Sequence, residues 1–210
     1  MNTEVYLIRH GEVDNPQDKA YGSLIDVPLT AEGIEQIKIL GREFKKAGII
    51  PDVIYSSFHT RGIRSAEILR EMLAPNIKLR QDDRLRDMDH PGLEKKYTTS
   101  DVVNKINDVW NYNWPSEDKN IPIEKREDMI ERLTEVISEI VKANQGKNVF
   151  IIVHGHPSAF YIWSLLHPNE KGMPLPSNLI REGIYLKKGK ARKLIFENST
   201  FIESERFSKE

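Results

Sequence analysis

Two short apolar runs that each end in histidine and glycine constrain the fold of this chain more than any other feature. They read YLIRHG at residues 6–11 and FIIVHG at residues 150–155. A short run of apolar, β-favouring residues is typical of a buried strand. In open α/β sheets, ligands bind beyond the carboxyl ends of the strands. The sequence therefore predicts that His10 and His154 mark a functional site at one edge of a sheet.

Strand-like and helix-like segments alternate along the chain. Apolar runs predict further strands at residues 52–55 and 77–79, and a closing hairpin of residues 183–186 and 192–196 around Lys188-Gly189-Lys190. Apolar residues at helical spacing predict helices between a Thr30 cap and Gly48, and over residues 60–73, 129–141 and 157–166. This alternation predicts an α/β fold, a three-layer α/β/α sandwich around a mostly parallel central sheet.

Residues 94–126 are less regular than the rest of the chain. They contain Trp110, Trp114, Pro115 and Pro122. We interpret them as a small helical cap insert, in which the two tryptophans pack. The 210 residues fit one domain, so a single domain of residues 1–210 that includes this insert is expected.

The composition narrows the possible partners. The chain is 39% hydrophobic and 30% charged with a formal net charge of −1, so it has no polybasic surface for nucleic acid or an anionic membrane. It has no cysteine, which excludes thiolate nucleophiles, disulfides and cysteine-based zinc sites and fits a cytoplasmic location. No apolar run approaches the roughly 20 residues of a membrane span. Nucleic acid and membranes are therefore not expected as partners.

Arginines stand next to the predicted strand ends. Arg9 precedes His10, and Arg61 follows the strand predicted at residues 52–55. A guanidinium group suits bidentate contact with phosphate, and a neutral histidine nitrogen can accept a phosphoryl group near pH 7. Gly11 is expected to let a ligand approach the main chain. Together with His154, these residues predict a pocket for a phosphate-like dianion.

Five motifs along the chain carry a resemblance to a known family. They are LIRHGE, YGSLIDVPLTAEGIEQ, YSSFHTRGIRSAE, LRDMD and VFIIVHGH. In this order, over roughly residues 4–160, they resemble the histidine phosphatase superfamily, also called phosphoglycerate mutase-like. The resemblance implies a phosphomonoesterase that forms a phosphohistidine intermediate without a metal or another cofactor.

The resemblance also implies roles for single residues. His10 would be the nucleophile that is phosphorylated. Arg9, Arg61 and His154 would bind the phosphoryl group, and the backbone N–H of Gly155 would join them.

The proton donor is a departure from the usual family pattern. Asp87, in LRDMD, occupies the position at which most short members carry glutamate. Asp89 is the alternative donor, because an extended segment would place it on the same face as Asp87. Val13 stands where a serine or threonine is usual, and the usual asparagine is displaced to Asn15, whose amide is expected to reach the phosphate.

The loop that follows the first histidine motif is expected to close over the substrate. Tyr21, Gly22 and Ser23 match this loop, and Ser23 either donates a hydrogen bond to the ligand or caps a turn. We interpret His59 as a solvated loop residue. His90, in DHPG, is a candidate for the rim of the phosphate pocket. His156 is expected in the first turn of the helix predicted from residue 157, and His167 at the C-terminal end of that helix.

Four functions stay open at this point. A phosphatase acting on a small phosphorylated metabolite is favoured over a mutase of the phosphoglycerate type. The resemblance implies that such mutases carry a longer insert between the acid and the second histidine, which shields phosphohistidine from water, whereas the gap from Asp87 to His154 is modest. A metallohydrolase could use His154 and His156, which would share a face if both lay on one strand. The departures at Asp87 and Val13 allow a phosphate-binding member with weakened catalysis. The oligomeric state is open and includes a homodimer.

Overall fold

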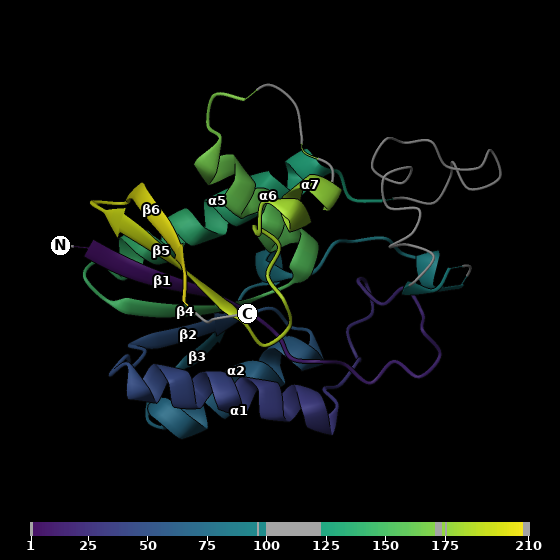
Figure 1. The fold of residues 1–210 in the computed structure, drawn as a ribbon, viewed down its shortest axis with the longest axis horizontal. Coiled ribbons are helices and arrows are strands. Elements are labelled where there is room, and N and C mark those ends of the chain that lie inside the picture. The colour runs from purple at the N-terminus through teal and green to yellow at the C-terminus, as the bar shows by residue number, and fades with distance from the viewer. Residues whose placement is uncertain (1, 96, 100–122, 171–173, 175, 208–210) are drawn as a thin grey trace.

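In a computed structural model, the chain forms a mixed six-stranded sheet with helices on both faces (Figure 1). The structure describes residues 2–95, 97–99, 123–170, 174 and 176–207. The strand order across the sheet is β3-β2-β4-β1-β5-β6. The strands are β1 (Asn2–Arg9), β2 (Val53–Ser56), β3 (Leu79–Gln81), β4 (Asn148–Val153), β5 (Ala191–Glu197) and β6 (Thr200–Arg206). The α/β class and the layered architecture are confirmed.

The two strands that precede the histidine motifs are parallel neighbours in the middle of the sheet. Arg9, the last residue of β1, lies opposite Val153, the last residue of β4. Both strands therefore end at the same level, and His10 and His154 follow side by side. Strands β1 to β4 are parallel, whereas β5 and β6 run antiparallel to their neighbours.

Helices cover the two faces of the sheet. They are α1 (Ala31–Lys46), α2 (Thr60–Leu73), α5 (Arg126–Ala143), α6 (Gly155–Leu166) and α7 (Pro176–Arg181), with 3₁₀ turns η1 (Asp83–Leu85) and η2 (Leu93–Lys95). Because side chains alternate along a strand, Tyr6 and Ile8 pack with α1 and α2, whereas Val5 and Leu7 pack with α5 and α6. Burial on both faces explains why β1 and β4 are continuous apolar runs.

The predicted helices agree with the structure at their informative ends. Thr30 caps α1, since its side chain accepts a hydrogen bond of 2.9 Å from the Gly33 N–H. The helix predicted over residues 60–73 is α2. His156 lies in the first turn of α6 and His167 caps its end, as expected.

The predicted closing hairpin is wrong. Residues 183–186 form no strand, and the hairpin partner of β5 is the downstream strand β6. The chain turns at Asn198 and Ser199, which adopt φ values of 48° and 66°. The segment after α7 instead folds back on that helix, where Ile184 and Tyr185 N–H donate to the Leu179 carbonyl. A short apolar run that packs irregularly has the same local pattern as a strand.

The third strand begins two residues later than its predicted start, at Leu79. Most of the proposed cap insert, including Trp110 and Trp114, lies outside the described residues. Within the described part of the chain, no helix is long and apolar enough to cross a bilayer.

Candidate active site

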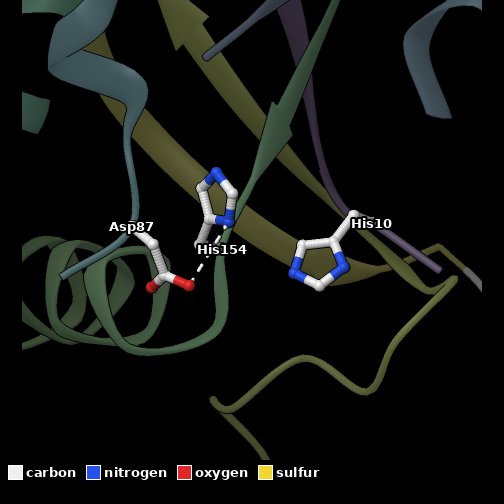
Figure 2. Close-up of side chains that lie close together, drawn as sticks. All are labelled: His10, Asp87 and His154. Carbon is white, nitrogen blue, oxygen red and sulfur yellow. Dashed lines mark ion pairs between the residues drawn. The ribbon is translucent and has the colours of Figure 1, made fainter. Parts of the chain in front are cut away.

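The ends of β1 and β4 bring two histidines together. The rings of His10 and His154 have centroids 5.2 Å apart, and both side chains are almost completely buried. Asp87 reaches the same place from the segment after η1 (Figure 2). Its Oδ2 atom lies 3.5 Å from Nδ1 of His154. Three titratable groups from distant parts of the sequence thus form one buried cluster.

His10 is oriented by its own neighbour. Its Nδ1 atom lies 2.8 Å from the Gly11 carbonyl, which can only accept, so Nδ1 carries the proton. This tautomer leaves the lone pair of Nε2 available. Burial, followed by the positive field of His154, Arg61 and Arg9, holds the pKa of His10 well below its usual value. The ring is therefore neutral near pH 7 and can act as a nucleophile.

Arg61 is completely buried at the start of α2. Its guanidinium donates to the Leu24 carbonyl at 2.7 Å, to the Gly22 carbonyl at 3.0 Å and to Oδ2 of Asp87 at 3.1 Å. Its Nε atom has no hydrogen-bond partner within the described residues. These contacts fix the guanidinium plane and keep one donor for a ligand.

Arg9 is held on the other side of the cluster. It donates to the Leu186 carbonyl at 2.8 Å, and its guanidinium lies 5.0 Å from the centre of the Tyr185 ring. Its Nε atom and Nδ1 of His154 are buried without a hydrogen-bond partner in the described part of the chain. Arg9, Arg61 and His154 were predicted as the phosphate-binding set, and the two arginines each keep an unsatisfied Nε donor, which is costly without a ligand.

A cavity of about 160 Å³ opens beside this cluster. Its lining includes Arg9, Tyr21, Gly22, Asp87, His90, Gly155, His156, Tyr185 and Lys188. Gly155 begins α6, so its N–H lies at a helix N-terminus, where anions are favoured. Gly22 and Gly155, both predicted to bind phosphate, thus line this cavity, and so does His90.

Asp87 is charged in this arrangement. Burial alone would raise its pKa, but His154, Arg61 and the Met88 N–H outweigh burial and hold the pKa of Asp87 well below the usual value. Burial lowers the pKa of His154 to about 4 despite the neighbouring carboxylate. With His154 neutral near pH 7, the charge that Asp87 pairs with is that of Arg61.

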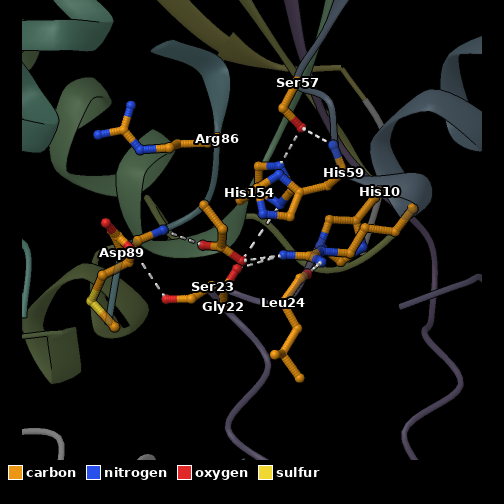
Figure 3. Close-up of polar contacts among 12 residues, drawn as sticks. His10, Gly22, Ser23, Leu24, Ser57, His59, Arg86, Asp89 and His154 are labelled. Carbon is orange, nitrogen blue, oxygen red and sulfur yellow. Dashed lines mark hydrogen bonds and ion pairs between the residues drawn. The ribbon is translucent and has the colours of Figure 1, made fainter. Parts of the chain in front are cut away.

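The alternative donor, Asp89, points elsewhere. It is exposed, and its Oδ1 accepts a hydrogen bond of 3.1 Å from the Ser23 hydroxyl. Figure 3 shows Asp89 and Ser23 beside one another, away from His10. The geometry therefore favours Asp87 over Asp89 as the acid.

Two loop residues predicted to touch the phosphate are used differently. Asn15 closes its own turn, because its amide donates to the Lys19 carbonyl at 2.8 Å and accepts from the Lys19 N–H at 3.1 Å. Ser23 accepts from the His90 N–H while it donates to Asp89. In this structure neither side chain is free for a ligand, so phosphate binding by Asn15 and Ser23 stays a prediction, and the contacts of Ser23 fit its other interpretation, the turn cap. Short polar side chains in loops readily bond nearby backbone.

For Gly11, the structure shows a packing reason for the glycine instead of a ligand contact. A Cβ atom there would lie 2.2 Å from the Gly33 carbonyl oxygen, so the glycine allows the chain to cross the start of α1. Val13, the other departure nearby, is buried and forms an isolated bridge with Leu29. Gly11 therefore packs against the first turn of α1, and Val13 pairs with the segment that leads into this helix.

Sequence reasoning missed Ser57 and misjudged His59. Oγ of Ser57 lies 2.9 Å from Nε2 of His154, so it orients that ring (Figure 3). His59 is buried, its ring 4.8 Å from that of His154, and burial lowers its pKa to about 3. The sequence signal for Ser57 was its place directly after β2. Tyr185 and Lys188 were also missed, because they sit on an irregular segment.

One group of side chains could hold a metal. His10, Asp87 and His154 each offer a ligand atom, and these atoms lie within 4.8 Å of one another. Arg61 already pairs with the carboxylate of that set. The metal pair considered from sequence, His154 with His156, does not share a strand, because β4 ends at Val153 and His156 packs against Tyr185.

Comparisons with known proteins agree with this arrangement. The family model described as histidine phosphatase superfamily (branch 1) matches residues 5–177. "Putative phosphoserine phosphatase 2" of Hydrogenobacter thermophilus is 31% identical over 72% of each chain. "Probable phosphoglycerate mutase GpmB" of Salmonella arizonae is 30% identical over 72% of this chain and 69% of that protein.

Solved structures show the same fold. YhfR of Bacillus stearothermophilus superposes with a TM-score of 0.72 at 24% identity, covering 95% of this chain and 94% of that one. A phosphoserine phosphatase of Entamoeba histolytica in complex with 3-phosphoglyceric acid gives 0.70 at 21% identity, covering 95% and 94%.

Proposed function

The chain belongs to the histidine phosphatase superfamily (branch 1) and is a phosphoric monoester hydrolase, and we propose that it passes the phosphoryl group of its substrate through His10 to water. One observation carries the mechanism. A neutral His10, fixed by its Nδ1 bond to the Gly11 carbonyl, shares its site with Arg9 and Arg61, which each keep a buried, free Nε donor. Its ring also lies 5.2 Å from that of His154.

The first half-reaction transfers the phosphoryl group to the enzyme. The lone pair of His10 Nε2 forms the N–P bond as the ester P–O bond breaks. Arg9, Arg61 and His154 donate to the phosphoryl oxygens, where the charge is spread in the transition state, and the Gly155 N–H joins them. The leaving oxygen takes a proton from Asp87 and departs as the alcohol.

Asp87 must first acquire that proton. In the free site its carboxylate is ionised beside Arg61. A bound phosphate dianion adds negative charge next to Asp87 and competes for Arg61, and both effects raise the pKa of the carboxyl group. Substrate binding therefore prepares the acid.

The second half-reaction returns the enzyme to its starting state. Asp87, now a carboxylate, takes a proton from a water molecule that attacks phosphorus. The N–P bond breaks, its electrons return to Nε2 of His10, and inorganic phosphate leaves. The ionised Asp87 of the free structure is the form that this step needs.

The substrate class is a small phosphorylated metabolite. Relatives in the family carry the name phosphoserine phosphatase, and structural neighbours include a mycobacterial glucosyl-3-phosphoglycerate phosphatase. The cavity of about 160 Å³ beside the site has Arg9 and Lys188 among its lining residues, which suits a compact anionic molecule. The mutase activity in the name of other relatives supports a second candidate, phosphotransfer back to a phosphoglycerate.

A quenched-flow experiment separates the two candidates. Phosphate-labelled 3-phosphoglycerate or phosphoserine is mixed with the enzyme, and the acid-labile label on His10 is followed. A phosphatase shows a transient label and inorganic phosphate as product, without any bisphosphate. A long-lived phosphohistidine that needs a bisphosphate primer, or label recovered in an isomeric phosphoglycerate, would establish the mutase instead.

Three further expectations stay predictions. A cytoplasmic location fits the cysteine-free sequence. A homodimer is one of the oligomeric states that the chain can have. Independence from metal and other cofactors is expected because the proposed mechanism uses side chains alone. Activity measured after dialysis against a chelator tests the last of these.

A further inference from the structure

Arg132, in the middle of α5, contacts the backbone of the segment that carries Asp87. Its Nη1 atom donates to the carbonyls of Arg84 at 2.7 Å and Arg86 at 3.0 Å. Its Nη2 atom donates to the carbonyl of Asp87 at 3.2 Å. One buried guanidinium therefore binds three carbonyls within four consecutive residues of an irregular segment.

Glu124 completes this contact from the other side. It accepts from Arg132 Nε at 2.6 Å and from Nη2 at 2.9 Å, a bidentate ion pair in which both side chains are more than nine-tenths buried. Its second oxygen also accepts from the Asp89 N–H at 3.0 Å, and its own N–H donates to the Asp89 carbonyl at 2.8 Å. The pair thus fixes the backbone on both sides of Asp87.

We propose that Arg132 and Glu124 are positioning residues that aim the Asp87 carboxyl group at the leaving oxygen. This inference rests on the proposed function, because it assumes that Asp87 is the acid. An aspartate side chain is short and has few rotatable bonds, so the position of its backbone decides where the carboxyl group lies. A misplacement of about 1 Å in a catalytic group costs about 10²-fold in rate.

The alternative is that the pair only stabilises the fold. The two roles differ in how the rate depends on the leaving group. An acid matters for a leaving oxygen that needs a proton and much less for one that leaves readily as an anion. Loss of stability alone reduces the hydrolysis of all substrates by the same factor.

The test compares two probes of similar shape, phenyl phosphate and p-nitrophenyl phosphate. For each variant, kcat/KM is measured with both, since this quantity reports the step in which the ester bond breaks. Asp87→Asn is the reference and should slow phenyl phosphate by about 10²–10⁴-fold, with a much smaller loss for p-nitrophenyl phosphate. Arg132→Met should move the ratio of the two rates in the same direction, by about 10-fold or more.

Two milder variants guard against a chain that does not fold. Arg132→Lys keeps the charge but cannot bind three carbonyls and a carboxylate at once, and Glu124→Gln keeps the size while weakening the ion pair. Both should shift the ratio less than Arg132→Met. Combined with Asp87→Asn, Arg132→Lys should cause no further shift, because the acid is already lost.

Glu139→Gln is the matched control. Glu139 lies on α5, seven residues beyond Arg132, is exposed, and pairs with the half-buried side chain of Arg84 rather than with backbone. It should leave the ratio unchanged. If Asp87→Asn shifts the ratio and the folded Arg132 and Glu124 variants do not, the positioning role is wrong and the proposed function stands. If Asp87→Asn itself leaves the ratio unchanged, the proposed acid fails, and the positioning role fails with it.

Discussion

The strand ends and the surrounding loops use their polar side chains in opposite ways. At the ends of β1 and β4, the Nε atom of Arg9 and the Nδ1 atom of His154 are buried without a hydrogen-bond partner in the described part of the chain. In the loops, Asn15, Ser23 and Asp89 bond to one another's segments or to their own turn. The strand ends thus hold groups in reserve for a ligand, whereas the loop residues stabilise the walls around it.

The difference has a physical cause. A residue at the end of a buried parallel strand is fixed by the hydrogen-bond ladder and by packing on both faces, so its side chain has few directions to take. A short polar side chain in a loop can bond to nearby backbone, and does so. Position in the fold is therefore a better predictor than residue type of which polar residues bind the ligand.

The largest expected effect comes from the strand end itself. His10→Ala should reduce hydrolysis of p-nitrophenyl phosphate by at least about 10⁴-fold, because the nucleophile acts as a unit with the groups around it. Steady-state assays on the purified variant measure this loss. His167→Ala is the control, since His167 caps α6 far along the chain from the site and should keep full activity. Substantial turnover by His10→Ala would remove the phosphohistidine mechanism altogether.

The same comparison explains how far sequence reasoning reached. The pairing of His10 with His154 was predictable, because each ends a continuous apolar run and parallel strands share their carboxyl edge. The bond from Ser57 to His154 joins residues 97 positions apart and has no local pattern. The close approach of Gly11 to Gly33 likewise depends on how α1 crosses the chain, which composition and periodicity do not report.

The stability of the folded chain should fall in mild acid because of the buried histidines at the site. Five of the six histidines, at positions 10, 59, 90, 154 and 156, have a pKa lowered by burial. The unfolded chain takes up these protons near pH 6.5 and the folded chain only at lower pH, so stability falls as pH drops below about 6.5. Each such histidine adds up to about 1.4 kcal/mol per pH unit to this loss.

Urea unfolding measured between pH 7 and pH 4.5 checks this slope. His59→Gln removes one histidine whose pKa is about 3 and should flatten the slope by close to one proton. Stability that is independent of pH across this range would show that the site histidines take up protons in the fold at the same pH as in the unfolded chain, which contradicts the lowered pKa values.

Gly11→Ala tests whether Gly11 is needed for packing against α1 or for the approach of a ligand. The new Cβ would meet the Gly33 carbonyl at 2.2 Å, so the start of α1 must move and the free energy of unfolding should fall by about 1–3 kcal/mol. Gly33→Ala produces the reciprocal clash, 2.1 Å from the Glu12 carbonyl, and should destabilise to a similar degree. Thermal unfolding compares the two. Unchanged stability of Gly11→Ala together with weaker binding of inorganic phosphate would restore the ligand-clearing role.

The smallest effect is expected at Asn15, where the contrast between strand end and loop is sharpest. Asn15→Asp keeps the oxygen that accepts from the Lys19 N–H and loses the amide that donates to the Lys19 carbonyl. If Asn15 only closes this turn, the KM for p-nitrophenyl phosphate should change by no more than about 2-fold, as for an ordinary surface substitution. If its amide bound the phosphate, the new carboxylate would face a dianion, and the KM would rise by about 10-fold for each ~1.4 kcal/mol of repulsion.

Asn15→Ala separates charge from contact, because it removes the turn bonds without adding a negative group. A small change in both variants places Asn15 with the wall of the site, whereas a large rise confined to Asn15→Asp would show that the loop approaches the phosphate when substrate binds.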